Sequence, residues 1–175
     1  MIRRMTREKL VTTSSEKEIS LTKSGLTEAE SILRRHRLAE RLAVDVLKVD
    51  LKRAHEEAHR LEHAFSPYME SRVVDILGHP TTCPFGHPIP GSNYVSNNSS
   101  VSLNKAKVGH DYLVDMLPED DMELLGYFVD NDFLPGAHIQ ITDLSNSRGV
   151  ITLKLGNKEL VFSMGISNLI RVTPA

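Results

Sequence analysis

Three histidines and three glutamates lie within nine residues, His55–His63, near the middle of the chain. In an α-helix each residue advances by about 100°, so His55, His59 and Glu62 fall within about 60° of one another and His63 lies at the edge of the same side. Neutral imidazole nitrogens and carboxylate oxygens are ligands that Zn²⁺, Fe²⁺ and Mn²⁺ all accept. The cluster therefore predicts divalent-metal binding.

One interpretation of the cluster is enzymatic. The run His55-Glu56-x-x-His59 matches the zinc-hydrolase pattern, in which two histidines at i and i+4 hold one zinc ion and the glutamate activates its water. Such a site needs a third zinc ligand, and Glu62 is poorly placed for it, because it lies roughly 10 Å from His55 along a helix axis.

The other interpretation involves two metal ions and no catalysis. An upstream helical segment offers His36 and Glu40, which are again four residues apart and share a helix face. An ion between the two helices would be held by His36, Glu40 and His55. A second ion would be held by His59, Glu62 and His63.

Composition narrows the class of protein. The 175 residues carry a net charge of −2 and a single cysteine, Cys83, which cannot form an internal disulfide. No run of about 18 apolar residues could span a bilayer. The basic start, residues 1–7, is not followed by the apolar stretch of a signal peptide. We therefore expect a cytoplasmic protein without a membrane segment.

Charge is distributed unevenly along the chain. The front end is basic, whereas residues 111–132 contain eight acidic side chains and no Lys or Arg. Because phosphate attracts cations, Arg3, Arg4 and Arg7 are the candidates for DNA contact, and the acidic segment would repel DNA.

Local patterns place the cluster on a helix. Strand-like residues 10–13 and 18–22 predict a hairpin, and helical periodicity follows over 27–48. Asp50 is placed to cap the helix that carries the cluster, and Ser66-Pro67 is typical of the start of a third helix. Apolar residues spaced by three and four predict a seam against another helix or a dimer partner: Leu51, Ala54, Ala58, Leu61 and Phe65.

The second half of the chain has a different pattern. Residues 79–107 are rich in Pro, Asn and Ser and predict a long loop, in which Cys83 and His87 are interpreted as packing residues, with a zinc site as the alternative. Short structured pieces follow, and alternating runs predict strands of an antiparallel barrel of about 60 residues: 138–142, 150–155, 160–163 and 169–172.

Three segments, in this order and spacing, resemble the diphtheria toxin repressor family of iron- and manganese-dependent transcription regulators. They are residues 35–42 (Arg-His-Arg-Leu-Ala-Glu-Arg-Leu), the cluster at 55–63, and residues 83–91 (Cys-Pro-Phe-Gly-His-Pro-Ile-Pro-Gly). Residues 134–136, Leu-Pro-Gly, are similar to the start of the family's SH3-like domain. The resemblance covers the whole chain and implies an α+β fold.

The resemblance also implies roles for the metal ligands. His36, Glu40 and His55 would form an ancillary site, and Glu62 and His63 would belong to the primary, activating site. His59 stands where iron regulators usually carry cysteine and manganese regulators glutamate, so the implied metal is Fe²⁺ or Mn²⁺, with Zn²⁺ or other divalent ions as substitutes. In the family the SH3-like domain can lend ancillary ligands, and here the candidates are Asp121 and Glu123.

The front of the chain departs from the family pattern. Residues 3–11 resemble only the end of the recognition helix and the entry to the wing, so most of the helix-turn-helix is missing. Either this is a truncated or mis-started chain of a full regulator, or it is a natural remnant. We expect operator DNA binding to be impaired, with any remaining phosphate contacts made by Arg3, Arg4 and Arg7.

The expected organisation is a winged-helix remnant over residues 1–24, a helical metal-binding and dimerisation domain over 25–92, a flexible linker over 93–115 and a small SH3-like β-barrel over 116–175. The predicted function is that of an Fe²⁺- or Mn²⁺-dependent transcriptional regulator of metal homeostasis. It is not an enzyme, and it binds operator DNA as a homodimer when the reader is complete. A zinc metallohydrolase and a metal-binding dimer module without DNA binding are the alternatives.

Overall fold

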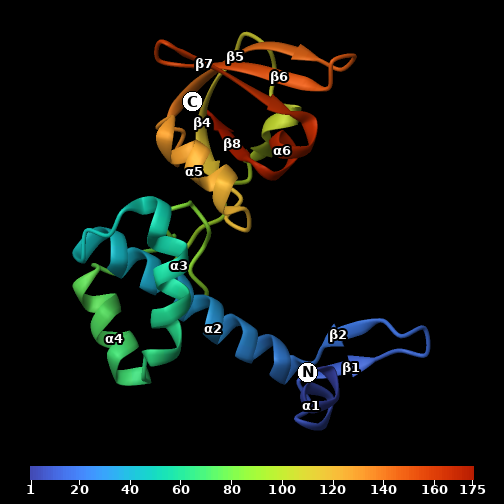
Figure 1. Cartoon of the computed structure of the whole chain (residues 1–175), viewed down its shortest axis with the longest axis vertical. Helices are drawn as coiled ribbons and strands as arrows, with labels where there is room; N and C mark the ends of the chain where they lie inside the picture. The colour runs from blue at the N-terminus through green and yellow to red at the C-terminus, as the bar shows by residue number, and fades with distance from the viewer.

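The computed structural model describes all residues, 1–175, and shows three parts arranged along the long axis of the molecule (Figure 1). A short helix and a two-stranded hairpin lie at one end, a cluster of helices lies in the middle, and a six-stranded antiparallel sheet with its own short helices lies at the other end. The prediction of an α+β fold is confirmed.

The N-terminal part consists of α1 (Ile2–Arg7) and the antiparallel strands β1 (Val11–Thr13) and β2 (Ile19–Leu21). Thr22 joins this part to the next helix, because its hydroxyl donates to the Lys9 carbonyl at 2.6 Å and accepts from the Gly25 amide at 3.0 Å. A Cβ added to Gly25 would lie 1.9 Å from the Leu10 carbonyl oxygen, so only glycine fits here. The hairpin is therefore held directly against the start of α2.

The helical part contains α2 (Lys23–Arg41), a π-helical continuation η1 (Leu42–Val46), α3 (Leu51–Leu61), the 3-10 turn η2 (Glu62–Ala64) and α4 (Pro67–Ile76). Asp50 and Ser66 cap α3 and α4 as predicted, through the amides of Lys52 and Met69. Two buried alanines, Ala39 on α2 and Ala58 on α3, belong to one apolar cluster and permit close approach of the two helices.

The end of α3 corrects one assumption. The sequence argument treated residues 55–63 as one continuous α-helix, whereas the α-helix ends at Leu61 and Glu62–Ala64 form a 3-10 turn. A 3-10 turn advances each residue by about 120° instead of 100°, so Glu62 and His63 are rotated away from the positions expected of them.

The C-terminal part is a sheet with the strand order β3-β8-β4-β5-β6-β7. Bulges in β4 and β5 help to curve the sheet around its core. The elements are β3 (Val101–Ser102), η3 (Leu103–Lys105), β4 (Asp111–Met116), α5 (Met122–Asp130), β5 (His138–Ser145), β6 (Val150–Leu155), β7 (Lys158–Ser163), α6 (Met164–Leu169) and β8 (Arg171–Pro174). The last strand starts later than predicted because α6 occupies residues 164–169.

The expected linker differs most from the structure. β3 and nearly all of β4 fall within residues 93–115, and both pair with β8 in the sheet. Tyr112 and Val114 are buried in the core of the sheet. Their alternation is too short to place a strand boundary within a segment that begins with many polar residues. We propose that the C-terminal domain begins near residue 101 and that the linker is shorter than 93–115.

The loop after α4 joins the two domains. Phe85 is buried in the core of the sheet domain, and its carbonyl accepts from the Leu117 amide at 3.0 Å. Gly86 has φ +91°, and a Cβ there would lie 1.9 Å from the Asp115 carbonyl oxygen. The loop therefore fixes the segment after β4 against the helical domain. No helix in the structure is long and apolar enough to cross a membrane.

Candidate metal centre

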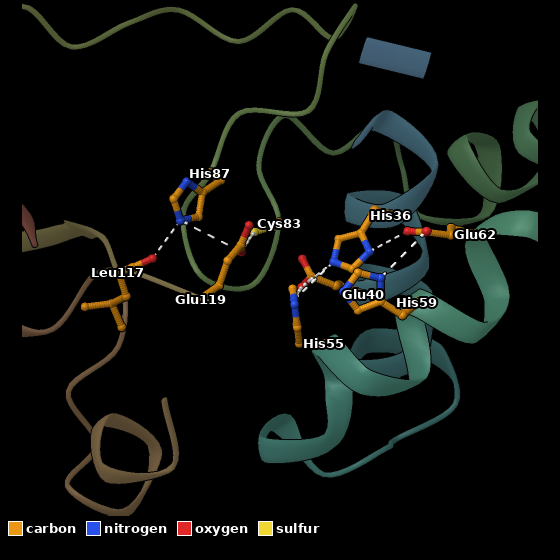
Figure 2. Close-up of polar contacts among 9 residues, drawn as sticks. All are labelled: His36, Glu40, His55, His59, Glu62, Cys83, His87, Leu117 and Glu119. Carbon is orange, nitrogen blue, oxygen red and sulfur yellow. Dashed lines mark hydrogen bonds and ion pairs between the residues drawn. The ribbon is translucent and has the colours of Figure 1, made fainter. Parts of the chain in front are cut away.

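The metal ligands predicted on α2 and α3 meet where these helices cross (Figure 2). Nε2 of His36 lies 3.1 Å from Nδ1 of His55, and Oε1 of Glu40 lies 3.1 Å from that same nitrogen of His55. The third edge, from His36 Nε2 to Glu40 Oε1, is 3.3 Å. Ligands about 2.1 Å from one ion are separated by about 3.0 Å in octahedral and about 3.4 Å in tetrahedral geometry. The ligand triangle therefore has the dimensions of one face of a metal site.

Glu40 supplies the negative charge of this triangle. Its side chain is fully buried, which by itself disfavours the charged form, but hydrogen bonds from His36 and His55 outweigh burial and lower the pKa of Glu40 to about 2. Its second oxygen, Oε2, is buried without a hydrogen-bond partner. Buried carboxylate oxygens almost always have a hydrogen-bond partner, so this oxygen without one is suited to bind a cation.

His36 is oriented for binding by a carboxylate on its other side. Its Nδ1 lies 2.7 Å from Oε2 of Glu62, and both side chains are buried. Donation from Nδ1 to Glu62 leaves Nε2 as the nitrogen that faces the triangle, which is the arrangement by which outer carboxylates hold metal-binding histidines. Burial lowers the pKa of His36, but the contacts with Glu40 and Glu62 are stronger and raise it above 6.5.

The predicted second set is only partly assembled. Glu62 Oε1 lies 3.7 Å from His59 Nδ1 and 3.3 Å from His63 Nε2, but its Oε2 is engaged with His36. His59 instead groups with the first set, because one ring nitrogen each from His36, His55 and His59 lies within 4.8 Å of the others. The 3-10 geometry of η2 accounts for the displacement of His63, whose side chain is 71% exposed.

The sheet domain reaches the site through Glu119, an acidic residue that was not among the predicted ligands. One ligand atom each of Glu40, His55 and Glu119 lies within 4.8 Å of the others. The predicted candidates lie elsewhere: Asp121 is the N-cap of α5 and accepts from the amides of Glu123 and Leu124, and Glu123 is an exposed residue of the first helical turn. Asp121 stands directly before an apolar helix, which is the sequence pattern of an N-cap. Because a capping carboxylate is already engaged with backbone amides, this pattern would have favoured Glu119 over Asp121 as the metal ligand.

Cys83 and His87 lie beside Glu119 in Figure 2. His87 Nε2 donates to the Leu117 carbonyl at 2.6 Å, and Cys83 Sγ lies 3.7 Å from Glu119 Oε2. Burial, together with the charges of Glu40 and Glu119, raises the pKa of the Cys83 thiol. Because a metal binds the thiolate, a thiol held in its neutral form favours the packing interpretation of Cys83.

The remaining predicted residues lie on the surface. Glu56, the base of the hydrolase pattern, is exposed and forms an ion pair with Arg60, one turn further along α3. It does not join the histidines of the triangle. Arg3, Arg4 and Arg7 lie on α1 and are exposed, and Arg4 pairs with Glu8 at 3.7 Å.

Family profiles match both domains. The metal-binding and dimerisation domain of iron-dependent repressors matches residues 22–91, and the FeoA domain matches residues 101–174. The chain is 31% identical to the iron-dependent repressor IdeR of Mycobacterium leprae over 98% of this chain and 80% of that protein. It is 29% identical to the diphtheria toxin repressor of Corynebacterium diphtheriae, over 98% and 79% of the respective chains.

Solved structures agree with these matches. A manganese-dependent transcriptional repressor in complex with manganese superposes with a TM-score of 0.86 at 26% identity, covering 99% of this chain and 82% of that one. ScaR with bound Zn²⁺ superposes with a TM-score of 0.82 at 27% identity, covering 100% and 87%. Together with the ligand triangle on α2 and α3, these matches show that the chain belongs to the diphtheria toxin repressor family of iron- and manganese-dependent regulators.

Proposed function

We propose that this chain is a divalent-metal-dependent transcriptional regulator that uses Fe²⁺ or Mn²⁺ as its effector, with Zn²⁺ or other divalent ions as substitutes. Its relatives are named as iron-dependent and manganese-dependent repressors, and one solved relative, ScaR, is seen with bound Zn²⁺ in one structure and with bound Cd²⁺ in another. Such a regulator acts on DNA as a homodimer in the cytoplasm and catalyses no reaction.

The observation that carries the proposal is the triangle of His36, Glu40 and His55, with the unpaired Oε2 of Glu40 beside it. These residues fit a divalent cation, which supplies positive charge and directional bonds between α2 and α3. Glu119 would add a ligand from the sheet domain. The ion would then join three segments that are far apart in the sequence.

The proposal keeps a second site made of His59, Glu62 and His63. Oε1 of Glu62 already faces both histidines, at 3.7 Å from His59 Nδ1 and 3.3 Å from His63 Nε2, while Oε2 contacts His36. Forming the site would require His59 to leave the first group and to close with Glu62 and His63 around a second ion. Occupation of this site would therefore be coupled to a shift of His59 relative to η2, the 3-10 turn that carries Glu62 and His63. A change of this kind is what a sensor needs, because the ion selects one of two arrangements.

The connection to DNA runs through α2. This helix carries His36 and Glu40 in its later half, and its first residues are tied to the hairpin through Thr22 and Gly25. An ion that fixes α2 against α3 would thereby fix the hairpin relative to the rest of the dimer. Large apolar side chains exposed on the helical domain support its packing against a partner copy: Leu47, Tyr68, Met69 and Ile76.

The zinc hydrolase is not favoured, because Glu56 is paired with Arg60 on the exposed side of α3. The metal-binding module without DNA binding differs from the regulator in one measurable property. That property is metal-dependent binding of the dimer to operator DNA.

The test of the regulator is sequencing of genomic DNA cross-linked to the protein in its native cell. Cells grown with added Mn²⁺ or Fe²⁺ are compared with cells grown with a chelator, and a Glu40→Gln strain serves as the control. Enrichment of a small set of promoter regions only with metal, and only with the wild-type protein, supports a regulator. No enrichment under any metal condition supports the dimer module instead.

A further inference from the structure

His59 lies with the first ligand set, although its sequence position pairs it with Glu62 and His63. Its ring centroid is 4.6 Å from that of His36 and 4.7 Å from that of His55, and the last two are 4.7 Å apart. The three rings therefore lie at nearly equal spacing, and Figure 2 shows their side chains gathered beside Glu40. His63, four residues further on, contacts only Glu62 at 3.3 Å.

The helices explain why three imidazoles converge here. His55 and His59 are one turn apart on α3, so both face α2, where His36 is buried against them. The α-helix ends two residues after His59, and the 3-10 turn carries His63 away from this face. The grouping therefore follows from the backbone and does not depend on a bound ion.

We propose that this protein has a second mode of metal binding, in which one Zn²⁺ is held in a four-coordinate site by three imidazoles and one carboxylate: His36, His55, His59 and Glu40. The proposal rests on the metal-dependent function proposed above and concerns which ion selects which ligands. Glu40 Oε1 already lies within 3.3 Å of the facing nitrogens of His36 and His55.

Ligand chemistry favours zinc in this mode. Zn²⁺ takes four ligands in a tetrahedron and binds imidazole well, whereas Mn²⁺ suits six-coordinate, oxygen-rich sites. A site with three nitrogens and one oxygen therefore discriminates against Mn²⁺. The ion can reach it, because a cavity of about 530 Å³ borders the three histidines and has Glu119 and Asp120 on its rim.

The two modes exclude each other. A His59 that binds zinc with His36 and His55 is not available to Glu62 and His63, so the second site of the proposed sensor lacks one of its three ligands. One Zn²⁺ per chain would then replace two Mn²⁺ or Fe²⁺ ions. Zinc would bind tightly without forming the arrangement that two ions select.

The experiment compares His59→Ala with the control His110→Ala in the full chain. The His59 side chain is 59% exposed, and His110 is an exposed histidine of the sheet domain outside both ligand sets, so neither change is expected to disturb folding, which circular dichroism verifies. Zn²⁺ and Mn²⁺ affinities are measured by competition with a chelator, ion number per chain by native mass spectrometry, and coordination by the visible absorption of the Co²⁺-loaded protein.

We expect one Zn²⁺ per chain in the wild type and in His110→Ala, with the strong Co²⁺ absorption of four-coordinate ions. His59→Ala should weaken Zn²⁺ binding by more than the roughly 10–100-fold that loss of an outer-shell partner costs, and should change the first Mn²⁺ affinity much less. Zn²⁺ affinity that is unchanged in His59→Ala, or lost equally in His110→Ala, overturns the inference. Failure of the wild type to bind any divalent ion would instead overturn the proposed function.

Discussion

Glu40→Gln removes the charge of the ligand triangle while keeping the size of the side chain. The pKa of Glu40 is about 2, against an ordinary value of 4.5, a difference of about 2.5 units. At about 1.4 kcal/mol per unit, the contacts of the ionised carboxylate stabilise the metal-free fold by about 3–4 kcal/mol at neutral pH. The side chain is fully buried, so solvent screening does not reduce this figure. A glutamine amide can keep part of the hydrogen bonding, which makes about 3–4 kcal/mol an upper value.

The pH dependence of this difference has a definite sign. A carboxyl with a lowered pKa in the folded state contributes stability that is present above its unfolded value of 4.5 and is lost as pH falls through about 2. The stability gap between wild type and Glu40→Gln should therefore shrink over that range. Urea unfolding followed by circular dichroism at several pH values measures the gap, and Glu28→Gln on the exposed surface of α2 is the control.

Metal adds a second, independent readout. A ligand present at 100 times its dissociation constant stabilises the folded state by about 2.7 kcal/mol. Wild type and Glu28→Gln should both gain this stability with Mn²⁺, and a chelator should remove it, whereas Glu40→Gln should gain little. If Glu40→Gln is as stable as wild type without metal and gains as much with metal, the role assigned to the triangle is wrong.

Three further predictions test the surroundings of the triangle. The contacts of His36 with Glu40 and Glu62 outweigh burial and raise its pKa, and metal must displace the proton that His36 then binds. Mn²⁺ affinity should therefore fall as pH drops through this raised pKa, starting at a higher pH than for an ordinary histidine. A titration in which Mn²⁺ affinity does not fall with pH would contradict this. Glu119→Gln should weaken Mn²⁺ binding with little loss of folding stability. Asp121→Ala should cost about 1 kcal/mol of folding stability, because α5 loses its N-cap, and should leave Mn²⁺ affinity unchanged. If a metal titration and urea unfolding give the reverse pattern, Asp121 and not Glu119 is the ligand. Gly86→Ala should destabilise the fold more than Gly78→Ala. Both residues have positive φ, but only at Gly86 would the added Cβ meet a backbone oxygen, at 1.9 Å. Equal melting temperatures of the two variants would exclude the domain-joining role of the loop.

The helical half of the molecule was largely predictable from the sequence. Asp50 and Ser66-Pro67 are local capping signals, and local signals suffice because a helix makes its hydrogen bonds within one segment. The pairing of His36 and Glu40 with His55 was predictable because all three lie in regular α-helices. The rotation of His63 relative to His59 was not predictable, because the change from α to 3-10 geometry after Leu61 has no clear sequence signal.

The contribution of the sheet domain was not predictable in the same way. Glu119 reaches the site because Phe85 and His87 hold the segment at Leu117, and these contacts join residues about 30 positions apart. Sequence periodicity reports only on neighbours along the chain, so it could identify an acidic segment but not choose its ligand. The short strand β3 was missed for a related reason, since it exists only as a partner of β8.

The central claim is that α2 and α3 hold a divalent ion between them. An anomalous-scattering map of crystals grown with Mn²⁺ tests it most directly, because the map locates ions without assumptions about ligands. The account predicts a peak bounded by His36, Glu40 and His55. A map with no peak there, or with one peak shared by His55 and His59 beside Glu56, would contradict it.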